Sequence, residues 1–292
     1  MRVRIAERAG FCYGVRRALS IVERAVNEHR GERIYTLGPI IHNPQAVQML
    51  KERMGVEPIS SLDEAEGGVL IIRSHGVPPA LIERARAKGL KVIDATCPFV
   101  KRAQNKARQL AEEGYQVVIF GEKEHPEVIG ILGHLPDGRA YVVETPEEID
   151  GLPPMRRVGV IFQTTQEMRS FGDMLMKLLL KSEELKIHNT ICHAIRDQQA
   201  AARRLAEEAD VMLVVGGRNS GNTRRLVQIC RDAGAKSYHI ETADEIDPSW
   251  LEGAELVGVA AGASTPDFII EGVLERLKSM GAEVEGRLKR SP

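Results

Sequence analysis

The chain has 292 residues, 43% of them hydrophobic and 28% charged, an ordinary composition for a folded protein of two or three domains. Its net charge of −1 excludes a globally basic surface for nucleic acid or anionic lipid, and no apolar run is long enough to span a membrane. The N-terminus lacks the apolar region of a secretory signal, and four cysteines are few for a disulfide scaffold, so we expect a reducing, cytoplasmic location.

Short apolar or β-branched runs alternate with helical patterns along the whole chain. Strands of this kind separated by helices predict an α/β fold with parallel sheets and right-handed crossovers. The predicted strands lie within residues 3–6, 33–38, 67–75, 91–95, 115–121, 157–163, 210–217, 237–241 and 256–262. The first predicted helix begins near residue 14. The other predicted helices lie within residues 43–55, 78–89, 98–114, 165–182, 193–209, 222–234 and 265–281.

One unit occurs three times: a strand, a cysteine and then a basic helix. The cysteines are Cys12, Cys97 and Cys192, separated by 85 and 95 residues, which is the size of a domain. The spacing predicts three similar α/β domains, each contributing one cysteine at the carboxyl end of a strand. We place them at 14–96, at 97–191, and at 192–282 together with the N-terminal strand 1–13, followed by a frayed tail at 283–292.

The three cysteines have several possible roles. Local CxxC pairs and the tight cysteine cluster of ferredoxins are both absent from the sequence. Three thiolates brought together by tertiary structure could hold zinc with a histidine, or an iron–sulfur cluster in which one iron lacks a cysteine. The fourth cysteine, Cys230, shares helical spacing with Leu226 and Ile229, so we expect it in the hydrophobic core.

Polar side chains follow nearly every predicted strand. Ligands of parallel α/β sheets bind outside the carboxyl ends of the strands, and helix N-termini with hydroxyl, amide and imidazole groups favour a phosphate-type anion there. Glu127 lies two residues after His125 and is the candidate proton donor. The other strand-end candidates are His42, His75, Thr164, Ser220, Asn222 and Ser264.

Several of these segments together resemble a known family. The segments "AGFCYGVRRAL", "GPIIHNP", "IRSHGV", "DATCPFV", "GEKEHPEV", "QTTQ", "NSGNT" and "AGASTPD" resemble, in family order and over essentially the whole chain, the 4-hydroxy-3-methylbut-2-enyl diphosphate reductases (the LytB/IspH family). The resemblance implies an oxidoreductase of the last step of the methylerythritol phosphate route. Its two-electron reductive dehydroxylation yields isopentenyl and dimethylallyl diphosphate. It also implies three domains in a pseudo-threefold arrangement around a central 4Fe–4S cluster.

The resemblance also assigns roles to individual residues. Glu127 would feed protons to the substrate, Thr164 would help to orient it, and His125 would assist. Cys12, Cys97 and Cys192 would hold the cluster and leave one iron open, and the electrons would come from a ferredoxin or flavodoxin. The allylic diphosphate would be bound by His42, His75, His125, Ser220, Gly221, Asn222 and Ser264.

One position departs from the family pattern, and two alternatives remain. Many relatives have a second serine before the asparagine where this chain has Gly221, so one hydroxyl is missing from the diphosphate site. Another three-domain 4Fe–4S enzyme, such as a quinolinate-synthase-like dehydratase or a diphthamide-forming enzyme, follows a similar plan. A non-catalytic three-cysteine metal-binding protein is the alternative from a different class.

Overall fold

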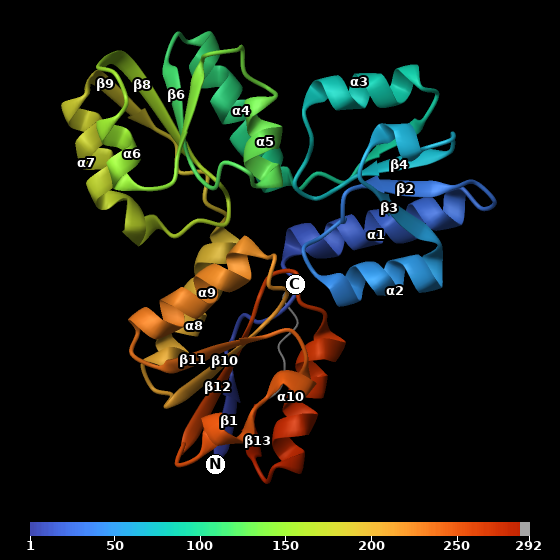
Figure 1. Cartoon of the computed structure of the whole chain (residues 1–292), viewed down its shortest axis with the longest axis vertical. Helices are drawn as coiled ribbons and strands as arrows, with labels where there is room; N and C mark the ends of the chain where they lie inside the picture. The colour runs from blue at the N-terminus through green and yellow to red at the C-terminus, as the bar shows by residue number, and fades with distance from the viewer. Residues whose placement is uncertain (287–292) are drawn as a thin grey trace. The chain divides into compact units, whose positions relative to one another are not determined.

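The computed structural model describes residues 1–286, and within them the strands form three parallel sheets, one of five strands and two of four (Figure 1). Sheet A has the order β11 (Lys236–Ile240), β10 (Val211–Val215), β12 (Leu256–Ala261), β1 (Arg2–Ile5) and β13 (Glu283–Glu285). Sheet B has the order β3 (Val56–Ile59), β2 (Ile34–Leu37), β4 (Val69–Ile72) and β5 (Lys91–Asp94). Sheet C has the order β7 (Ala140–Val143), β6 (Gln116–Phe120), β8 (Met155–Phe162) and β9 (Ser182–Ile187).

Helices connect these strands, as parallel pairing requires. The α-helices are α1 (Tyr13–Glu28), α2 (Pro44–Met54), α3 (Pro79–Ala87), α4 (Pro98–Glu112), α5 (Pro126–Leu132), α6 (Pro146–Asp150), α7 (Gly172–Leu180), α8 (His193–Ala206), α9 (Gly221–Asp232) and α10 (Asp267–Ser279). Short 3₁₀ turns lie at Leu62–Glu64, Met168–Phe171, Ala243–Glu245 and Pro248–Leu251. The predicted class, a parallel α/β fold built as three units, is therefore confirmed.

The alternation of side chains along the strands gives each sheet two buried faces. In sheet A, Val211 and Leu213 pack with α10, whereas Met212 and Val214 pack with α8 and α9. Sheet C is covered in the same way, by α4 and α5 on one face and by α6 and α7 on the other. Figure 1 shows these helices on opposite sides of their sheets. Burial on both faces explains why the central strands read as continuous apolar runs.

The chain divides into two compact units. The first contains Met1–Arg16, Ile41–Met49 and the chain from His193 onward, and so holds sheet A. The second contains Arg17–Ile40 and Leu50–Cys192, and so holds sheets B and C. β1 pairs with β12, so the N-terminal strand joins the last part of the chain. The detailed domain boundaries stay a prediction.

The structure adds strands that the sequence pattern did not reveal. These are β3, β7, β9 and β13, and each is an edge strand of its sheet. The predicted helix at 165–182 is instead a 3₁₀ turn followed by α7, and Ser182 already belongs to β9. The frayed tail predicted from residue 283 is wrong at 283–285, because these residues pair with β1, and its last six residues lie outside the described part of the chain.

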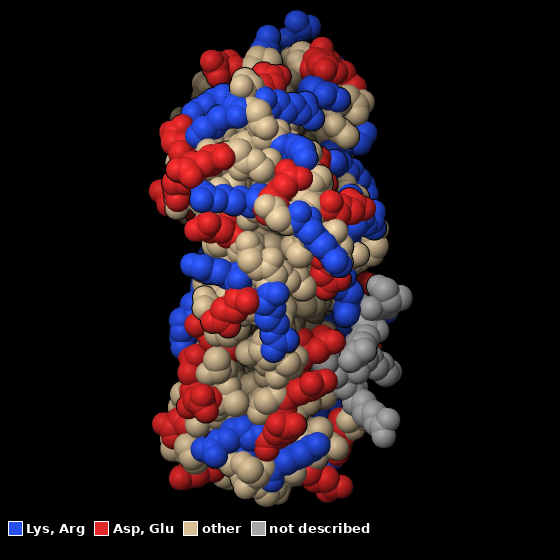
Figure 2. Space-filling model, turned by 90° about the vertical axis from the view of Figure 1, so that its right-hand side faces the viewer, with Lys and Arg blue, Asp and Glu red and all other residues tan. Residues whose placement is uncertain are grey.

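The distribution of charged side chains on the surface agrees with the net charge of −1 (Figure 2). On the face shown in Figure 2, basic and acidic side chains are interspersed rather than gathered into a large patch of one sign. Within the described residues, no helix is long and apolar enough to cross a membrane.

Candidate active site

Each of the three predicted cysteines lies between a strand and a helix, and each of those strands belongs to a different sheet. Cys12 follows β1 of sheet A, Cys97 follows β5 of sheet B, and Cys192 follows β9 of sheet C. Helices α1, α4 and α8 begin at the next residue. A helix N-terminus carries a partial positive charge and so favours a thiolate. The repeat seen in the sequence is therefore a structural repeat.

The backbone of each cysteine is held in the same way. Its N–H donates to the carbonyl two residues beyond the end of the neighbouring parallel strand, which is β12, β4 or β8. The repeat thus fixes each cysteine beside the strand-end loop that carries the next candidate residues. The bonds are Cys12 N–H to Ala263 O (3.1 Å), Cys97 N–H to Ser74 O (2.9 Å) and Cys192 N–H to Thr164 O (3.0 Å).

In the second unit, the strand-end loop of β4 packs closely on helix α5. A Cβ atom on Gly133 would lie 2.5 Å from the Pro78 Cβ, and one on Gly130 would lie 3.4 Å from the His75 carbonyl oxygen. These glycines are three residues apart and share one face of α5, so the loop can approach that face. The rings of His75 and His125 consequently meet edge to face, with centroids 5.6 Å apart and planes at 80°.

Glu127 is buried in the first turn of α5 and binds Thr164 with both carboxyl oxygens. Its Oε1 accepts the Thr164 backbone N–H at 2.6 Å, and its Oε2 accepts the Thr164 hydroxyl at 2.7 Å. The Nδ1 atom of His125 accepts the Glu127 N–H at 3.1 Å. A neutral His125 therefore carries its ring proton on Nε2, where it is a donor. The carboxyl group is thus held in one orientation.

The environment of Glu127 suits a proton donor. Burial raises the pKa of the Glu127 carboxyl from its ordinary value of 4.5 to about 7. The hydrogen bonds from Thr164 act in the opposite direction and lower this pKa, while the negative charge of Glu122 raises it. A carboxyl with a pKa near 7 is populated in both its acid and its base form at neutral pH, so it can give up a proton and regain it.

These contacts link most of the candidate residues of the second unit. The Cys97 N–H donates a hydrogen bond to the carbonyl of Ser74, the residue before His75. The His75 ring packs edge to face on the His125 ring, and the Thr164 hydroxyl donates to the Glu127 carboxyl group. The set in this unit is Cys97, His75, His125, Glu127, Thr164 and Cys192.

In the first unit, candidate residues meet at the start of α9. Ser220 is the N-cap of this helix, and its Oγ accepts the Thr223 N–H at 3.3 Å. Gly221 and Asn222 are buried in the first turn. The Nδ2 of Asn222 donates to the Oε1 of Gln198 at 3.0 Å, while the Oδ1 of Asn222 is buried without a hydrogen-bond partner among the described residues. An unsatisfied buried amide oxygen beside a helix N-terminus indicates a polar binding site.

Glycines let the neighbouring loops approach this helix start. A Cβ on Gly262, just after β12, would lie 2.2 Å from the Thr223 Oγ1. A Cβ on Gly217, just after β10, would lie 2.8 Å from the backbone oxygen of His42. Ser264 follows two residues after Gly262, at the end of the same strand. The structure therefore brings the His42 backbone and the β12 loop to the start of α9.

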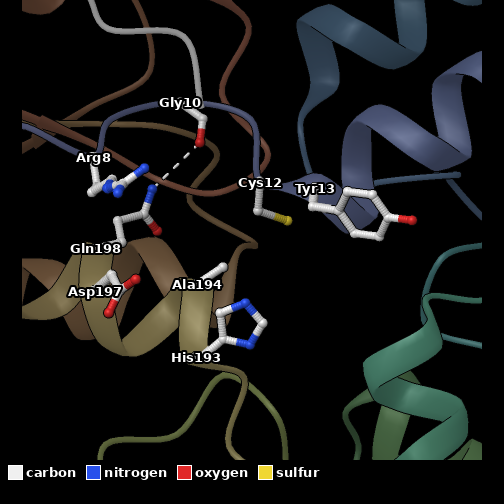
Figure 3. A pocket seen from close by; sticks show the side chains of 8 residues that line it. All are labelled: Arg8, Gly10, Cys12, Tyr13, His193, Ala194, Asp197 and Gln198. Atoms are coloured by element: carbon white, nitrogen blue, oxygen red, sulfur yellow. Dashed lines mark hydrogen bonds between the residues drawn. The ribbon is translucent and has the colours of Figure 1, made fainter. Parts of the chain in front are cut away.

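A cavity of about 230 Å³ lies beside Cys12 in the first unit. Figure 3 shows Cys12, which comes just before α1, and His193 at the start of α8, with Gln198 further along that helix. The amide of Gln198 donates to the Gly10 carbonyl at 3.4 Å and to the Ala261 carbonyl at 2.9 Å. Gln198 therefore ties the Cys12 loop and the end of β12 to α8.

Gln198 is one of the residues that sequence reasoning missed. It bonds to three segments that are distant in the chain, including the Asn222 side chain. Its signal was available, because Ile195, Gln198, Ala202 and Leu205 share one helical stripe and the glutamine is the polar member. A polar side chain on an apolar stripe needs a partner in the interior.

Thr190 was also missed, and no local pattern could reveal it. Its Oγ1 donates to the Phe162 carbonyl at 2.5 Å and accepts the Phe162 N–H at 2.8 Å. The Thr190 side chain thereby forms hydrogen bonds with the last residue of β8, two residues before Cys192. Cys230, in contrast, is a fully buried core residue as predicted, and burial raises the pKa of its thiol to about 12.

Comparison with known proteins shows the family to which the chain belongs. The model of the LytB protein family matches residues 3–278. The chain belongs to this family. A LytB relative from Aquifex aeolicus, named 4-hydroxy-3-methylbut-2-enyl diphosphate reductase, is 50% identical over 98% of each chain. A relative of the same name from Geobacter sulfurreducens is 47% identical over 98% of this chain and all of its own.

Solved structures agree with the LytB assignment. A structure of (E)-4-hydroxy-3-methyl-but-2-enyl diphosphate reductase, described as the terminal enzyme of the non-mevalonate pathway, has a TM-score of 0.71 and 49% identity. It matches 96% of this chain and 100% of its own. The Plasmodium falciparum reductase has a TM-score of 0.88 and 25% identity, with 100% of this chain and 95% of its own covered. The family resemblance predicted from the sequence is confirmed.

Proposed function

We propose that this protein is a 4-hydroxy-3-methylbut-2-enyl diphosphate reductase. It removes the substrate's hydroxyl group with two electrons and two protons and forms isopentenyl diphosphate and dimethylallyl diphosphate. Family membership over residues 3–278 supports this reaction and decides against the quinolinate-synthase-like alternative. The observation that carries the chemistry is the buried Glu127 carboxyl, with a pKa of about 7, held by Thr164 at a strand end.

The cofactor of the reaction is an iron–sulfur cluster, and we assign Cys12, Cys97 and Cys192 as three ligands of a 4Fe–4S cluster with one open iron. The donor set fits, because each cysteine precedes a helix and none of the three forms a disulfide in the described chain. No group of three His, Cys, Asp or Glu side chains forms a metal site within residues 1–286 as described. The proposal assigns one cysteine from each predicted domain to a single cluster, in line with the pseudo-threefold arrangement that the family resemblance implies.

When bound, the cluster supplies electrons and a Lewis-acidic iron to the substrate's oxygen. The chain's own residues supply the protons. Glu127 in its acid form would donate a proton toward the departing hydroxyl, and Thr164, whose hydroxyl is hydrogen-bonded to Glu127 Oε2, would orient that group. His125, with its Nδ1 occupied by the Glu127 N–H, presents a donor from Nε2. Glu127, Thr164 and His125 therefore act as the catalytic group.

The diphosphate binds where hydrogen-bond donors gather at strand ends. The N-terminus of α9 offers its backbone N–H groups and its partial positive charge to an anion. Ser220 uses an oxygen lone pair to cap the helix, which leaves its hydroxyl proton to donate to phosphate. Gly221 contributes only a backbone N–H at this point. The full set assigned to the diphosphate is His42, His75, His125, Ser220, Gly221, Asn222 and Ser264.

The electrons come from another protein. The sequence contains neither the GxGxxG fingerprint nor a P-loop, so we assign the donor to a small redox protein, a ferredoxin or flavodoxin. A cytoplasmic location and the absence of nucleic-acid and membrane partners complete the proposal.

The decisive experiment combines metal analysis with turnover. Anaerobically purified protein is assayed for iron, sulfide and zinc, and then for conversion of 4-hydroxy-3-methylbut-2-enyl diphosphate with a chemically reduced viologen dye as electron donor. We expect a brown protein that releases both isomeric products. A colourless protein that holds only zinc after anaerobic reconstitution, and that forms no product, would instead establish the non-catalytic metal-binding alternative.

A further inference from the structure

The second unit carries a groove whose lining contains none of the residues assigned to the proposed reaction. Its volume is about 270 Å³, and it lies beside the ends of β2, β3 and β4 and along helix α3. Two arginines, Arg73 and Arg84, line it together with apolar side chains. A volume slightly below the range of about 300–1,000 Å³ typical of ligand sites suits a small molecule.

Arg73 is a half-buried cation in this groove. Its Nε is buried and has no hydrogen-bond partner among the described residues. Burial lowers the pKa of the Arg73 guanidinium, and no neighbouring carboxylate offsets this effect. A half-buried guanidinium with an unsatisfied inner N–H and no carboxylate beside it favours an anion that would supply charge and acceptors.

The floor of the groove is shaped to hold this guanidinium. Gly38 has a φ of 71°, and a Cβ atom there would lie 2.5 Å from the Nη1 of Arg73. The Gly38 N–H donates to the Ile59 carbonyl at 2.7 Å, which fixes the floor against the neighbouring strand. The positive φ favours glycine at this position, and the missing Cβ leaves the space that the Arg73 guanidinium occupies.

The acidic groups around the groove are compatible with an anion. Arg84 lies 3.8 Å from Asp63, but both side chains are exposed, and such a pair contributes little. Arg84 can therefore exchange this partner for a ligand. The Glu64 carboxylate accepts the backbone N–H groups of Ser60 and Ser61 at 2.9 and 2.8 Å, so its charge is directed at the 3₁₀ turn.

The remaining wall is apolar. Leu37, Leu62 and Val77 are buried, Leu81 is half-buried, and Ile129 is 44% exposed at the rim. Covering this surface would remove apolar area from water, which favours a ligand with a hydrocarbon part.

We propose that this groove binds a phosphorylated molecule with a short hydrocarbon chain. The phosphate head lies at Arg73 and Arg84, and the chain covers Leu81 and Ile129. Phosphate suits the site because a guanidinium offers a planar fork of donors that matches its oxygens. This groove shares no lining residue with the set assigned to the diphosphate, and the inference does not depend on the proposed reaction.

The test is calorimetric titration of the full-length, cluster-loaded protein with geranyl diphosphate and, separately, with inorganic pyrophosphate. Arg73→Met removes the inner cation, and Arg84→Gln removes the outer one. Arg86→Gln, on the same helix but outside the groove, is the matched control. We expect Arg73→Met and Arg84→Gln each to weaken geranyl diphosphate binding at this site about tenfold or more, because each removes charge-assisted hydrogen bonds. Arg86→Gln should bind as the unaltered protein does.

Each outcome decides the proposal. Geranyl diphosphate bound equally well by the unaltered protein, Arg73→Met and Arg84→Gln lies in another site and overturns it. Pyrophosphate bound in the groove as tightly as geranyl diphosphate overturns the role of the apolar wall. Arg84 is exposed, so Arg84→Gln keeps the test valid if Arg73→Met fails to fold. Kinetics of Arg84→Gln should be unchanged, which separates this site from the site of reaction.

Discussion

Glu127 shows how position, rather than residue type, makes an acid. The same side chain on the surface would be ionised at neutral pH, but burial raises its pKa to about 7. Its acid form is therefore present below pH 7 and is lost as the pH rises through that value. If Glu127 supplies the proton, kcat should fall on the alkaline side with a midpoint near pH 7.

Removing the acid tests this role directly. Glu127→Gln keeps the size of the side chain and an acceptor for the Thr164 N–H, so folding and cluster content should be retained. Turnover should fall by about 10²–10⁴-fold, the usual contribution of general acid catalysis. The measurement is steady-state kcat with iron content as a control. Normal turnover with a full cluster would remove Glu127 from the proposed role.

The same pKa predicts an effect on stability. The folded pKa of about 7 lies above the ordinary value of 4.5, so the folded state holds an extra proton between these pH values. The stability gained from this protonation is complete below about pH 4.5 and is lost as the pH rises through 7. Relative to Glu127→Gln, the unaltered protein should lose on the order of 3 kcal/mol over this interval. Denaturant unfolding of both proteins at several pH values measures it, and parallel pH profiles would contradict it.

Gln198 is expected to position Asn222 rather than to touch substrate. Gln198→Met keeps the volume but removes the acceptor of the Asn222 amide, so KM for substrate should rise about five- to tenfold with a smaller change in kcat. Asn222→Ala removes the proposed contact itself. If Gln198 acts through Asn222, the double variant should be little worse than Asn222→Ala, as a double-mutant cycle can show. Fully additive effects would mean that Gln198 supports only the fold.

At the scale of elements, the close approach of strand ends to helix α9 depends on glycine. A Cβ at Gly262 would lie 2.2 Å from Thr223, so Gly262→Ala must displace the first turn of α9 and should destabilise the protein by about 1–3 kcal/mol. Gly272, inside α10, has no atom within 4 Å of its Cβ position, so Gly272→Ala should stabilise by about 0.5–1 kcal/mol. Denaturant unfolding of both variants checks the opposite signs, and a neutral Gly262→Ala would contradict the packing argument.

The strands that the sequence did not predict share one property. β3, β7, β9 and β13 are edge strands, and β13 reads Glu-Val-Glu. An edge strand has one paired side and more contact with water, which explains the charged residues of β9 and β13, whereas β7 reads Ala-Tyr-Val-Val and is apolar throughout. Val211–Val215 and Leu256–Ala261 are fully buried strands and were visible in the sequence for the opposite reason.

At the scale of the whole molecule, the proposed cluster would draw its cysteine ligands from loops that follow strands of three different sheets. We expect three variants to lose most of their bound iron and visible absorbance, because each lacks one proposed thiolate ligand. They are Cys12→Ser, Cys97→Ser and Cys192→Ser. Cys230→Ala should keep both, since this thiol is buried in the core of sheet A. Iron and sulfide analysis after anaerobic reconstitution measures the effect. Full iron content in any of the three serine variants would remove that cysteine from the ligand set.

By itself, the sequence determined the α/β class, the central strands, the threefold cysteine repeat and the strand ends where the candidate residues lie. Each of these features depends on residues that are close together in the sequence, through the spacing of apolar residues or the order of short segments. Tertiary structure alone decided the raised pKa of Glu127, the hydrogen bonds of Gln198, the edge strands β3, β7, β9 and β13, and the buried Nε of Arg73. These depend on burial and on partners distant in the chain, because a side chain's charge and hydrogen bonds are set by what packs against it.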